Sequence, residues 1–155
     1  MTPAINAAKR ARITYAVHGY EHDKTATAYG EEAAGKLGLS PARVFKTLLA
    51  QLDGQELVVA VVPVANQLNL KQLAAALNAR SADMARPADA ERATGYVVGG
   101  ISPLGQKKAL RTVIDDSARG HATIYVSAGR RGLEIELAPA DLAALTRAAF
   151  AAIAR

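Results

Sequence analysis

The chain of 155 residues has no cysteine and no tryptophan, and aromatic residues make up only 5% of it. The absence of cysteine excludes a disulfide framework, a thiolate zinc site and a cysteine nucleophile. Because aromatics are scarce, the core must consist mainly of Val, Leu, Ile and Ala. Half of the residues are hydrophobic, which is typical of a globular protein, and the length predicts a single domain over residues 1–155.

Metal-binding and targeting signals are also scarce. His18 and His22 stand four residues apart, but Gly19 and Tyr20 between them indicate a strand end and not the helix that such a metal pair requires. We therefore expect no metal and no cofactor. Charged residues interrupt the N-terminal segment, and no window reaches the length of a membrane-spanning helix, so we expect a cytoplasmic protein without membrane contact.

The charge balance is basic, with 19 Lys and Arg against 14 Asp and Glu and a net charge of +5. A basic surface attracts polyanions such as nucleic acids. This signal is weak by itself, because many soluble proteins are mildly basic.

Hydrophobic periodicity and turn signals predict an α+β domain with a curved, largely antiparallel sheet and helices outside it. Thr2 and Pro3 suit the N-cap and first position of a helix, and Asp53-Gly54 between two apolar runs predicts a hairpin. The predicted helices span residues 3–11, 31–39, 69–79, 86–95 and 139–155. The predicted strands span residues 13–20, 44–52, 56–64, 111–115, 122–129 and 133–137, with a further strand that starts at 96 and runs into a glycine-proline loop.

Lys46 stands inside the apolar run of residues 44–49, although lysine is among the residues least often buried. It could be an edge-strand lysine that reaches water and discourages aggregation. It could also be a cation at the floor of a pocket, where low dielectric strengthens its hold on a carboxyl, carbonyl or phosphate oxygen. From the residues alone, both interpretations stay open.

A glycine-rich loop and a strand end supply the other candidates. The loop is GGISPLG, from Gly99 to Gly105, whose N–H groups could bind a carbonyl or phosphate oxygen, although an ordinary connecting loop explains it as well. It matches neither the Walker loop nor the dinucleotide fingerprint. Ser127 lies at a predicted strand end without a G-x-S-x-G elbow, which favours a binding hydroxyl over a nucleophile.

The segment after Ser127 is charged. Arg130 and Arg131 form a basic turn that either meets phosphates or is simply solvated. Glu134 and Glu136 alternate with apolar residues and share one strand face, which a solvent-facing side explains as well as a functional one. The residues taken singly therefore predict a pocket and leave its chemistry open.

Several motifs, in order and at similar spacing, resemble the YbaK-type Cys-tRNA(Pro) deacylases of the YbaK/EbsC family. They are GYEHD at 19–23, VFKTLL at 44–49, VAVVPV at 59–64, ATGYVVGGISPLGQKK at 93–108 and ATIYVSAGRRGLEIEL at 122–137. These proteins belong to the superfamily of free-standing and inserted editing domains of prolyl-tRNA synthetase. The resemblance runs almost end to end and implies their fold, a barrel-like mixed sheet surrounded by helices.

The resemblance also implies a site. Lys46 matches the key active-site lysine, and Gly99 and Pro103 fit a G-x-x-x-P loop whose backbone holds the aminoacyl ester. Glu134 departs from the family, which often has aspartate there, so its direct role in substrate binding is in doubt. The substrate-binding residues that the resemblance implies are Tyr20, Gly99, Gly100, Ile101, Ser102, Pro103, Ser127 and Glu134.

The implied function is removal of cysteine wrongly attached to tRNA(Pro), with the substrate's own thiol as nucleophile. Two alternatives are a deacylase for another small amino acid on tRNA, such as alanine, and a non-catalytic module that binds tRNA or a synthetase. We expect the acceptor end of mischarged tRNA(Pro) as partner, with prolyl-tRNA synthetase in a ternary complex. The basic residues near the pocket motifs, expected to contact tRNA, are Lys107, Lys108, Arg111, Arg130 and Arg131.

Overall fold

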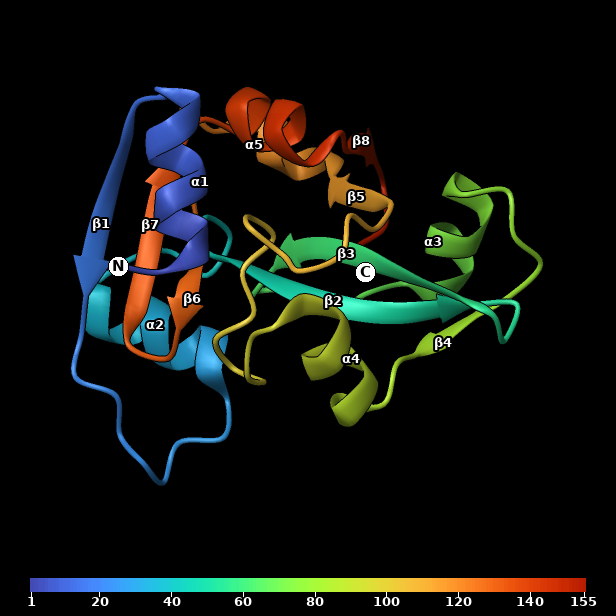
Figure 1. Cartoon of the computed structure of the whole chain (residues 1–155), viewed down its shortest axis with the longest axis horizontal. Coiled ribbons are helices and arrows are strands. Elements are labelled where there is room, and N and C mark those ends of the chain that lie inside the picture. Colours follow the sequence, from blue (N-terminus) through green and yellow to red (C-terminus); the bar gives the residue numbers. More distant parts are fainter.

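Two β-sheets with helices outside them form the computed structural model, which describes residues 1–155 (Figure 1). One sheet has the strand order β1-β7-β6 and the other β4-β2-β3-β5-β8. The strands are β1 (Tyr15–Gly19), β2 (Phe45–Leu52), β3 (Glu56–Pro63), β4 (Ala82–Met84), β5 (Thr112–Asp115), β6 (Ile124–Arg130), β7 (Leu133–Leu137) and β8 (Ala149–Ala151). The helices are α1 (Pro3–Ala11), α2 (Tyr29–Leu37), α3 (Leu70–Ala76), α4 (Pro87–Thr94), α5 (Pro139–Thr146) and the 3-10 turn η1 (Asp116–Gly120).

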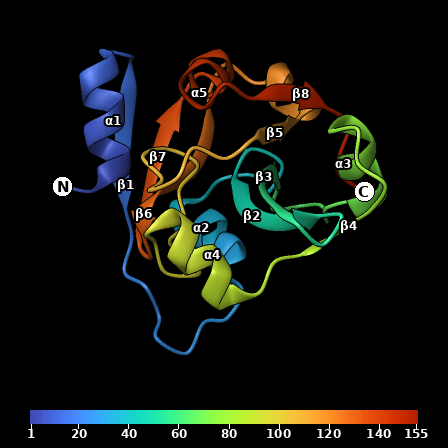
Figure 2. The ribbon, with the colours of Figure 1, turned by 45° about the vertical axis from the view of Figure 1, so that its right-hand side comes forward.

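The two sheets meet where β2 begins beside β6. Val44 forms a parallel bridge with Tyr125, and the Tyr125 N–H donates to the Arg43 carbonyl at 3.1 Å. Behind this junction lies the main core, in which Phe45 of β2 and Ile135 of β7 are almost completely buried. Helix α1 lies along the three-stranded sheet, and α3 lies at the opposite end of the molecule (Figure 2). The core is aliphatic, as the composition predicts.

Local signals in the sequence placed several elements correctly. The Thr2 hydroxyl accepts a hydrogen bond from the Ile5 N–H at 3.2 Å, and Pro3 occupies the first position of α1. At the predicted hairpin, Asp53 and Gly54 have φ angles of 52° and 67°, as a tight turn between twisted strands requires. The predicted α+β class is confirmed. No helix combines the length and apolar character needed to cross a bilayer.

The strand predicted from Tyr96 is wrong. Residues 96–98 form no strand, because their hydrogen bonds go to the side chains of α4 instead. The Tyr96 N–H donates to the Thr94 hydroxyl at 3.2 Å, and the Val98 N–H donates to the Glu91 carboxylate at 2.8 Å. The apolar pattern indicated burial, and Tyr96 is indeed buried, but not in a sheet.

The final helix predicted to reach the C-terminus is also wrong. Helix α5 ends at Thr146, and Arg147 takes a left-handed conformation with φ 55°. The chain then forms β8, which pairs in parallel with β5, just as β5 pairs with β3. Tertiary pairing here overrides the helix propensity of an Ala-rich segment. The five-stranded sheet is therefore mixed, and the two sheets do not close into a barrel.

Candidate functional site

A cavity of about 300 Å³ lies beside the outer edge of β2. Its walls come from the first turn of α2, from α4 and from the loop that follows α4, which passes beside β2 in the fold (Figure 1). β6 and β7 complete it. Five of the residues predicted for the site line this cavity together, namely Lys46, Gly99, Ile101, Ser127 and Glu134.

The Lys46 side chain is half-buried in this wall, between the buried residues Phe45 and Leu49 of the same strand. No carboxylate lies within ion-pair distance of its ammonium group. A cation held beside an apolar cavity without a protein partner can interact with an anionic or carbonyl oxygen of a ligand. The position matches the pocket interpretation of Lys46.

The glycine loop contributes backbone groups. Gly99 has φ 89°, and a side chain there would come within 2.8 Å of both the Arg131 guanidinium and the Tyr29 ring. The Gly100 N–H donates to the Val97 carbonyl at 2.9 Å, whereas the N–H groups of Gly99 and Ile101 donate to no acceptor in the protein. Because both residues line the cavity, these two amides are available to a ligand there.

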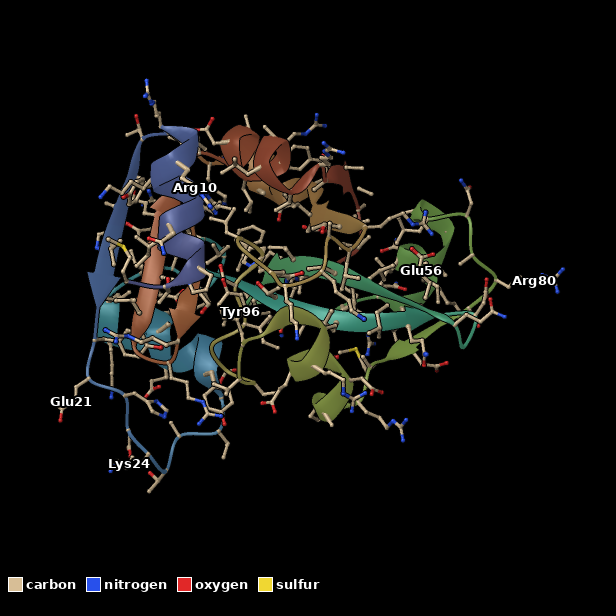
Figure 3. All side chains as sticks on the ribbon, in the orientation of Figure 1. Arg10, Glu21, Lys24, Glu56, Arg80 and Tyr96 are labelled. Atoms are coloured by element: carbon tan, nitrogen blue, oxygen red, sulfur yellow. The ribbon has the colours of Figure 1, made fainter.

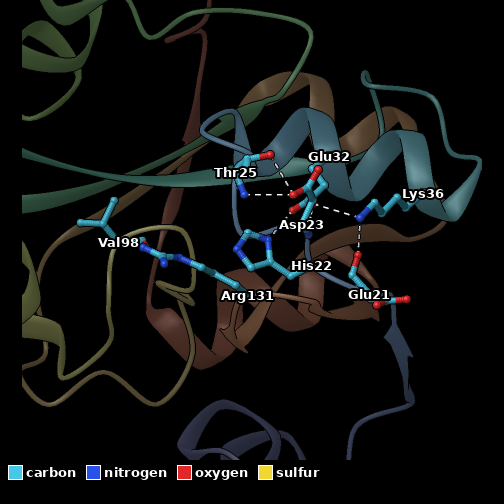
Figure 4. A network of polar contacts seen from close by, with 8 residues as sticks. All are labelled: Glu21, His22, Asp23, Thr25, Glu32, Lys36, Val98 and Arg131. Carbon is cyan, nitrogen blue, oxygen red and sulfur yellow. Dashed lines mark hydrogen bonds and ion pairs between the residues drawn. The ribbon is translucent and has the colours of Figure 1, made fainter.

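Arg131 holds this loop in place. Its Nε and Nη2 donate to the Val98 carbonyl at 2.9 and 2.6 Å (Figure 4). Its guanidinium also lies over the Tyr29 ring, 4.6 Å from the centroid. Because Tyr29 and Val98 both line the cavity, one side chain joins α2, the glycine loop and the β6–β7 turn at its wall.

The segment before α2 is tied down in the same region. His22 Nδ1 lies 2.7 Å from the Glu32 carboxylate, which also accepts from the Asp23 N–H at 2.8 Å (Figure 4). Tyr20 donates its N–H to the Gly132 carbonyl, and burial raises the pKa of its phenol. Tyr20 does not line the cavity. Through its N–H it anchors the segment before α2 to the β6–β7 turn.

Glu134 is the buried carboxyl of the site, with 6% of its surface exposed. It pairs in register with Ser127 across β6 and β7, and both line the cavity. Burial raises the pKa of Glu134 to about 8, and its carboxyl makes no hydrogen bond or ion pair with protein groups. The Ser127 hydroxyl accepts a hydrogen bond from the Gly129 N–H at 3.2 Å.

The other residues of the predicted loop do not line the cavity and instead determine the shape of the loop. Gly100 packs so closely on Arg130 that a side chain would lie 2.7 Å from the Arg130 Cα. Ser102 is fully buried, and its hydroxyl accepts from the Leu104 N–H. Pro103 lines a second cavity on another side of the loop.

The predicted tRNA contacts are not all brought to the cavity. Arg130 is exposed at the β6–β7 turn, next to the glycine loop. Lys107 and Lys108 follow the glycine loop, and Lys108 lines the second cavity. Arg111 makes two 2.8 Å hydrogen bonds to the carboxylate of Glu56, which lies toward the α3 end of the molecule (Figure 3).

Several lining residues carried no signal in the sequence. Tyr29 opens a helix, Thr47 stands next to Lys46, and Ala85 and Pro87 lead into α4. Only their position in the fold identifies them. No group of three His, Asp or Glu side chains could hold a metal ion.

Comparisons with known proteins agree with the fold. A family profile described as "Aminoacyl-tRNA editing domain" matches residues 22–145. The Enterococcus faecalis protein named "Putative Cys-tRNA(Pro)/Cys-tRNA(Cys) deacylase EbsC" is 42% identical over 123 residues, which cover 79% of this chain and 75% of that protein. A "Proline--tRNA ligase" of Acidithiobacillus ferrooxidans is 34% identical over 102 residues, 66% of this chain but only 18% of the ligase.

A solved structure supports the same architecture. The protein described as "a putative trans-editing enzyme for prolyl tRNA synthetase" superposes with a TM-score of 0.85 and 22% identity, over 99% of this chain and 95% of that one. At this identity, the likeness concerns the fold alone.

Proposed function

The chain belongs to the aminoacyl-tRNA editing domain family, and from this premise we propose that it is a trans-editing deacylase that removes cysteine from mischarged tRNA(Pro). The family resemblance and the name of the Enterococcus faecalis relative support cysteine as the amino acid. Cysteine and proline are similar in size, and a small pocket discriminates by only about 1–3 kcal/mol per methylene-sized difference. A second site must therefore clear the errors of the synthetase.

The observation that carries the proposal is the set of groups without protein partners around one small cavity. Lys46 has no carboxylate partner, and the Gly99 and Ile101 amides have no acceptor. An aminoacyl ester presents a carbonyl oxygen that becomes negative in the transition state. Donors and a cation already in place at that oxygen stabilise the developing charge without reorganisation.

The nucleophile in this mechanism belongs to the substrate. The cysteine thiol attacks its own ester carbonyl, forming the S–C bond of a cyclic thioester, and the bond to the 3′ oxygen of the tRNA breaks. The thiol proton passes to that departing oxygen, and water later opens the thioester. The protein contributes orientation, through Lys46 and the Gly99–Pro103 loop, and stabilisation of the oxyanion.

We also propose that recognition of the tRNA is shared with a partner. Arg130 is an exposed cation next to the cavity loop, and a domain of this size has few further surfaces for reading tRNA identity. Prolyl-tRNA synthetase would then recognise the tRNA. The Acidithiobacillus ferrooxidans ligase contains a segment similar to this chain. Binding of tRNA(Pro) by this chain alone would then be weak and sensitive to salt.

The deciding experiment measures deacylation of Cys-, Ala-, Ser- and Pro-tRNA(Pro) by wild type and by Lys46→Ala. We expect Cys-tRNA(Pro) to be cleared fastest, Ser-tRNA(Pro) to react poorly because a hydroxyl is a weaker nucleophile, and Lys46→Ala to lose at least about 100-fold in rate. Clearance of Ser-tRNA(Pro) as fast as Cys-tRNA(Pro) would exclude the thiol mechanism. Faster clearance of Ala-tRNA(Pro) would favour a water-based alanine deacylase.

A wild-type protein without activity on any aminoacyl-tRNA would favour a binding module. Unchanged deacylation by Lys46→Ala would show that the lysine has no catalytic part. Circular dichroism of the variant serves as the control for folding.

A further inference from the structure

The outer edge of strand β2 is only partly covered by other strands. β4 pairs with it at Ala50–Leu52, and the bridge to β6 is made at Val44. Between these two points, Thr47 pairs only with Val61 of β3, on the inner side. The stretch around Thr47 is therefore a short free edge, and Thr47 lines the cavity.

The hydrogen bonds on either side fix the direction of the Thr47 backbone groups. The Val44 carbonyl accepts from Val64, next to β3, at 2.8 Å, whereas the Leu49 carbonyl accepts from Ala85, on the outer side, at 3.0 Å. Along a strand, the backbone N–H and C=O groups of successive residues point alternately to one side and to the other. Even-numbered residues of β2 therefore bond to β3, and the N–H and C=O of Thr47 point outward to the cavity.

The Thr47 side chain adds a second, independent sign. Its Oγ1 is buried and has no hydrogen-bond partner in the protein. Such atoms are rare in proteins, and each one calls for an explanation, of which a catalytic role is one. A main-chain edge and an unpartnered hydroxyl thus meet at one wall of the cavity.

We propose that Thr47 binds the main-chain atoms of the aminoacyl group, as a neighbouring strand residue would; this rests on the proposed function. In an antiparallel ladder, two residues exchange an N–H···O=C bond in each direction. The substrate's α-ammonium donates to the Thr47 carbonyl and to Oγ1. The Thr47 N–H donates to the ester carbonyl oxygen, together with the amides of the glycine loop.

This arrangement separates two tasks within the cavity. The ammonium and carbonyl are common to all aminoacyl esters, so Thr47 recognises the class of substrate and not its side chain. Choice among amino acids falls to the remaining walls. Because the Thr47 N–H meets the oxygen that becomes negative, it also contributes to the oxyanion hole.

Two variants test the hydroxyl. Thr47→Val keeps the shape and removes Oγ1, and Thr47→Ser keeps the hydroxyl. A hydrogen bond to a charged donor is strong, so we expect Thr47→Val to lower kcat/KM for Cys-tRNA(Pro) about tenfold and Thr47→Ser to stay within about threefold. The melting temperature of Thr47→Val should equal or exceed that of wild type, since no internal bond is lost. Equal kcat/KM for Thr47→Val and wild type would overturn the role of the hydroxyl.

Amide hydrogen exchange tests the main-chain contacts. The probe is 3′-cysteinylamino-3′-deoxyadenosine, an amide that resists hydrolysis, with its 3-mercaptopropionyl counterpart, which lacks only the α-ammonium. We expect the cysteinyl probe to bind more tightly and to slow exchange at Thr47 by about tenfold or more. The Leu48 amide, bonded to β3, is the internal control and should stay protected throughout.

The outcomes separate this inference from the proposed function. Unchanged exchange at Thr47 when the probe saturates the protein overturns the main-chain contacts, as does equal affinity for the two probes. If wild type deacylates Cys-tRNA(Pro) but does not bind the cysteinyl probe, the proposed main-chain contacts are overturned as well. Wild type without activity on any aminoacyl-tRNA instead overturns the proposed function, and with it the assignment of an aminoacyl group to this edge.

Discussion

Two carboxylates on one strand, Glu134 and Glu136, lie in opposite surroundings. Both stand on the same face of β7, as the alternation in the sequence predicts, but Glu134 is buried at the cavity without a partner. Glu136 accepts from the Thr123 hydroxyl at 2.6 Å and from Arg43 at 3.3 Å, and it pairs with His18 at 3.0 Å. Burial raises the pKa of Glu134 to about 8. The hydrogen bond from Thr123, followed by the contact with His18, lowers the pKa of Glu136.

The fold leaves polar groups unsatisfied at the cavity and satisfies them elsewhere on the same strand. At Glu136 every partner is supplied by the protein, so the cluster stabilises the sheet. At the cavity, Glu134, Lys46 and the Thr47 hydroxyl share the absence of protein partners. Groups kept in this costly state are candidates for ligand contact. An exposed strand face would account for Glu136 and not for Glu134.

Glu134 should make the free energy of unfolding strongly dependent on pH, more than any other group discussed below. Its pKa is raised in the folded protein above the ordinary value of 4.5, so the neutral form stabilises folding and ionisation opposes it. Relative to Glu134→Gln, wild type should lose about 1.4 kcal/mol per pH unit as pH rises from 4.5 to about 8. Urea unfolding of both proteins across this range gives the difference, and a constant difference would show that Glu134 is not buried as neutral acid.

Smaller effects are expected at the neighbouring residues Arg130 and Arg131. The Arg130 side chain has no protein partner, whereas Arg131 donates to the Val98 carbonyl. Arg131→Ala releases the Val98 carbonyl and the Tyr29 ring, so the glycine loop should lose its position and kcat/KM should fall about tenfold, the equivalent of one hydrogen bond to a charged group. Arg131→Lys should not restore it, because lysine cannot replace the planar guanidinium.

Arg130→Ala is the matched control, with the same charge change on the same turn. It should leave kcat with saturating substrate unchanged and reduce the salt dependence of tRNA binding by about one ion. If Arg131→Ala instead changed only this salt dependence, Arg131 would be a phosphate contact and not a support of the loop.

The smallest effect is expected at Glu136. Its lowered pKa means that the ionised form stabilises folding above pH 4.5 and that this contribution is lost as the pH falls through the folded pKa. Glu136→Gln should therefore unfold more easily than wild type at pH 7, by about 1 kcal/mol, and the difference should shrink in acid. Its deacylation rate per folded molecule should match that of wild type. A loss of activity would place this cluster within the site.

Much of the site was predictable because its residue types are unusual where they stand. A lysine inside an apolar strand and a Gly-Pro loop both break the local pattern, and Lys46, Gly99, Ile101, Ser127 and Glu134 do line one cavity. Thr47 could not be found this way, because threonine is an ordinary strand residue.

Features that depend on near neighbours along the chain could be read from the amino-acid sequence. The cap at Thr2, the Asp53-Gly54 turn and the α+β class follow from residues within a few positions of one another. Tertiary structure alone decided which polar groups find partners, since Arg43 reaches Glu136 across 93 positions, and it turned the C-terminal segment into β8 beside β5. Burial and pairing are properties of the assembled sheets, so two glutamates with the same local pattern acquire opposite pKa shifts and different roles.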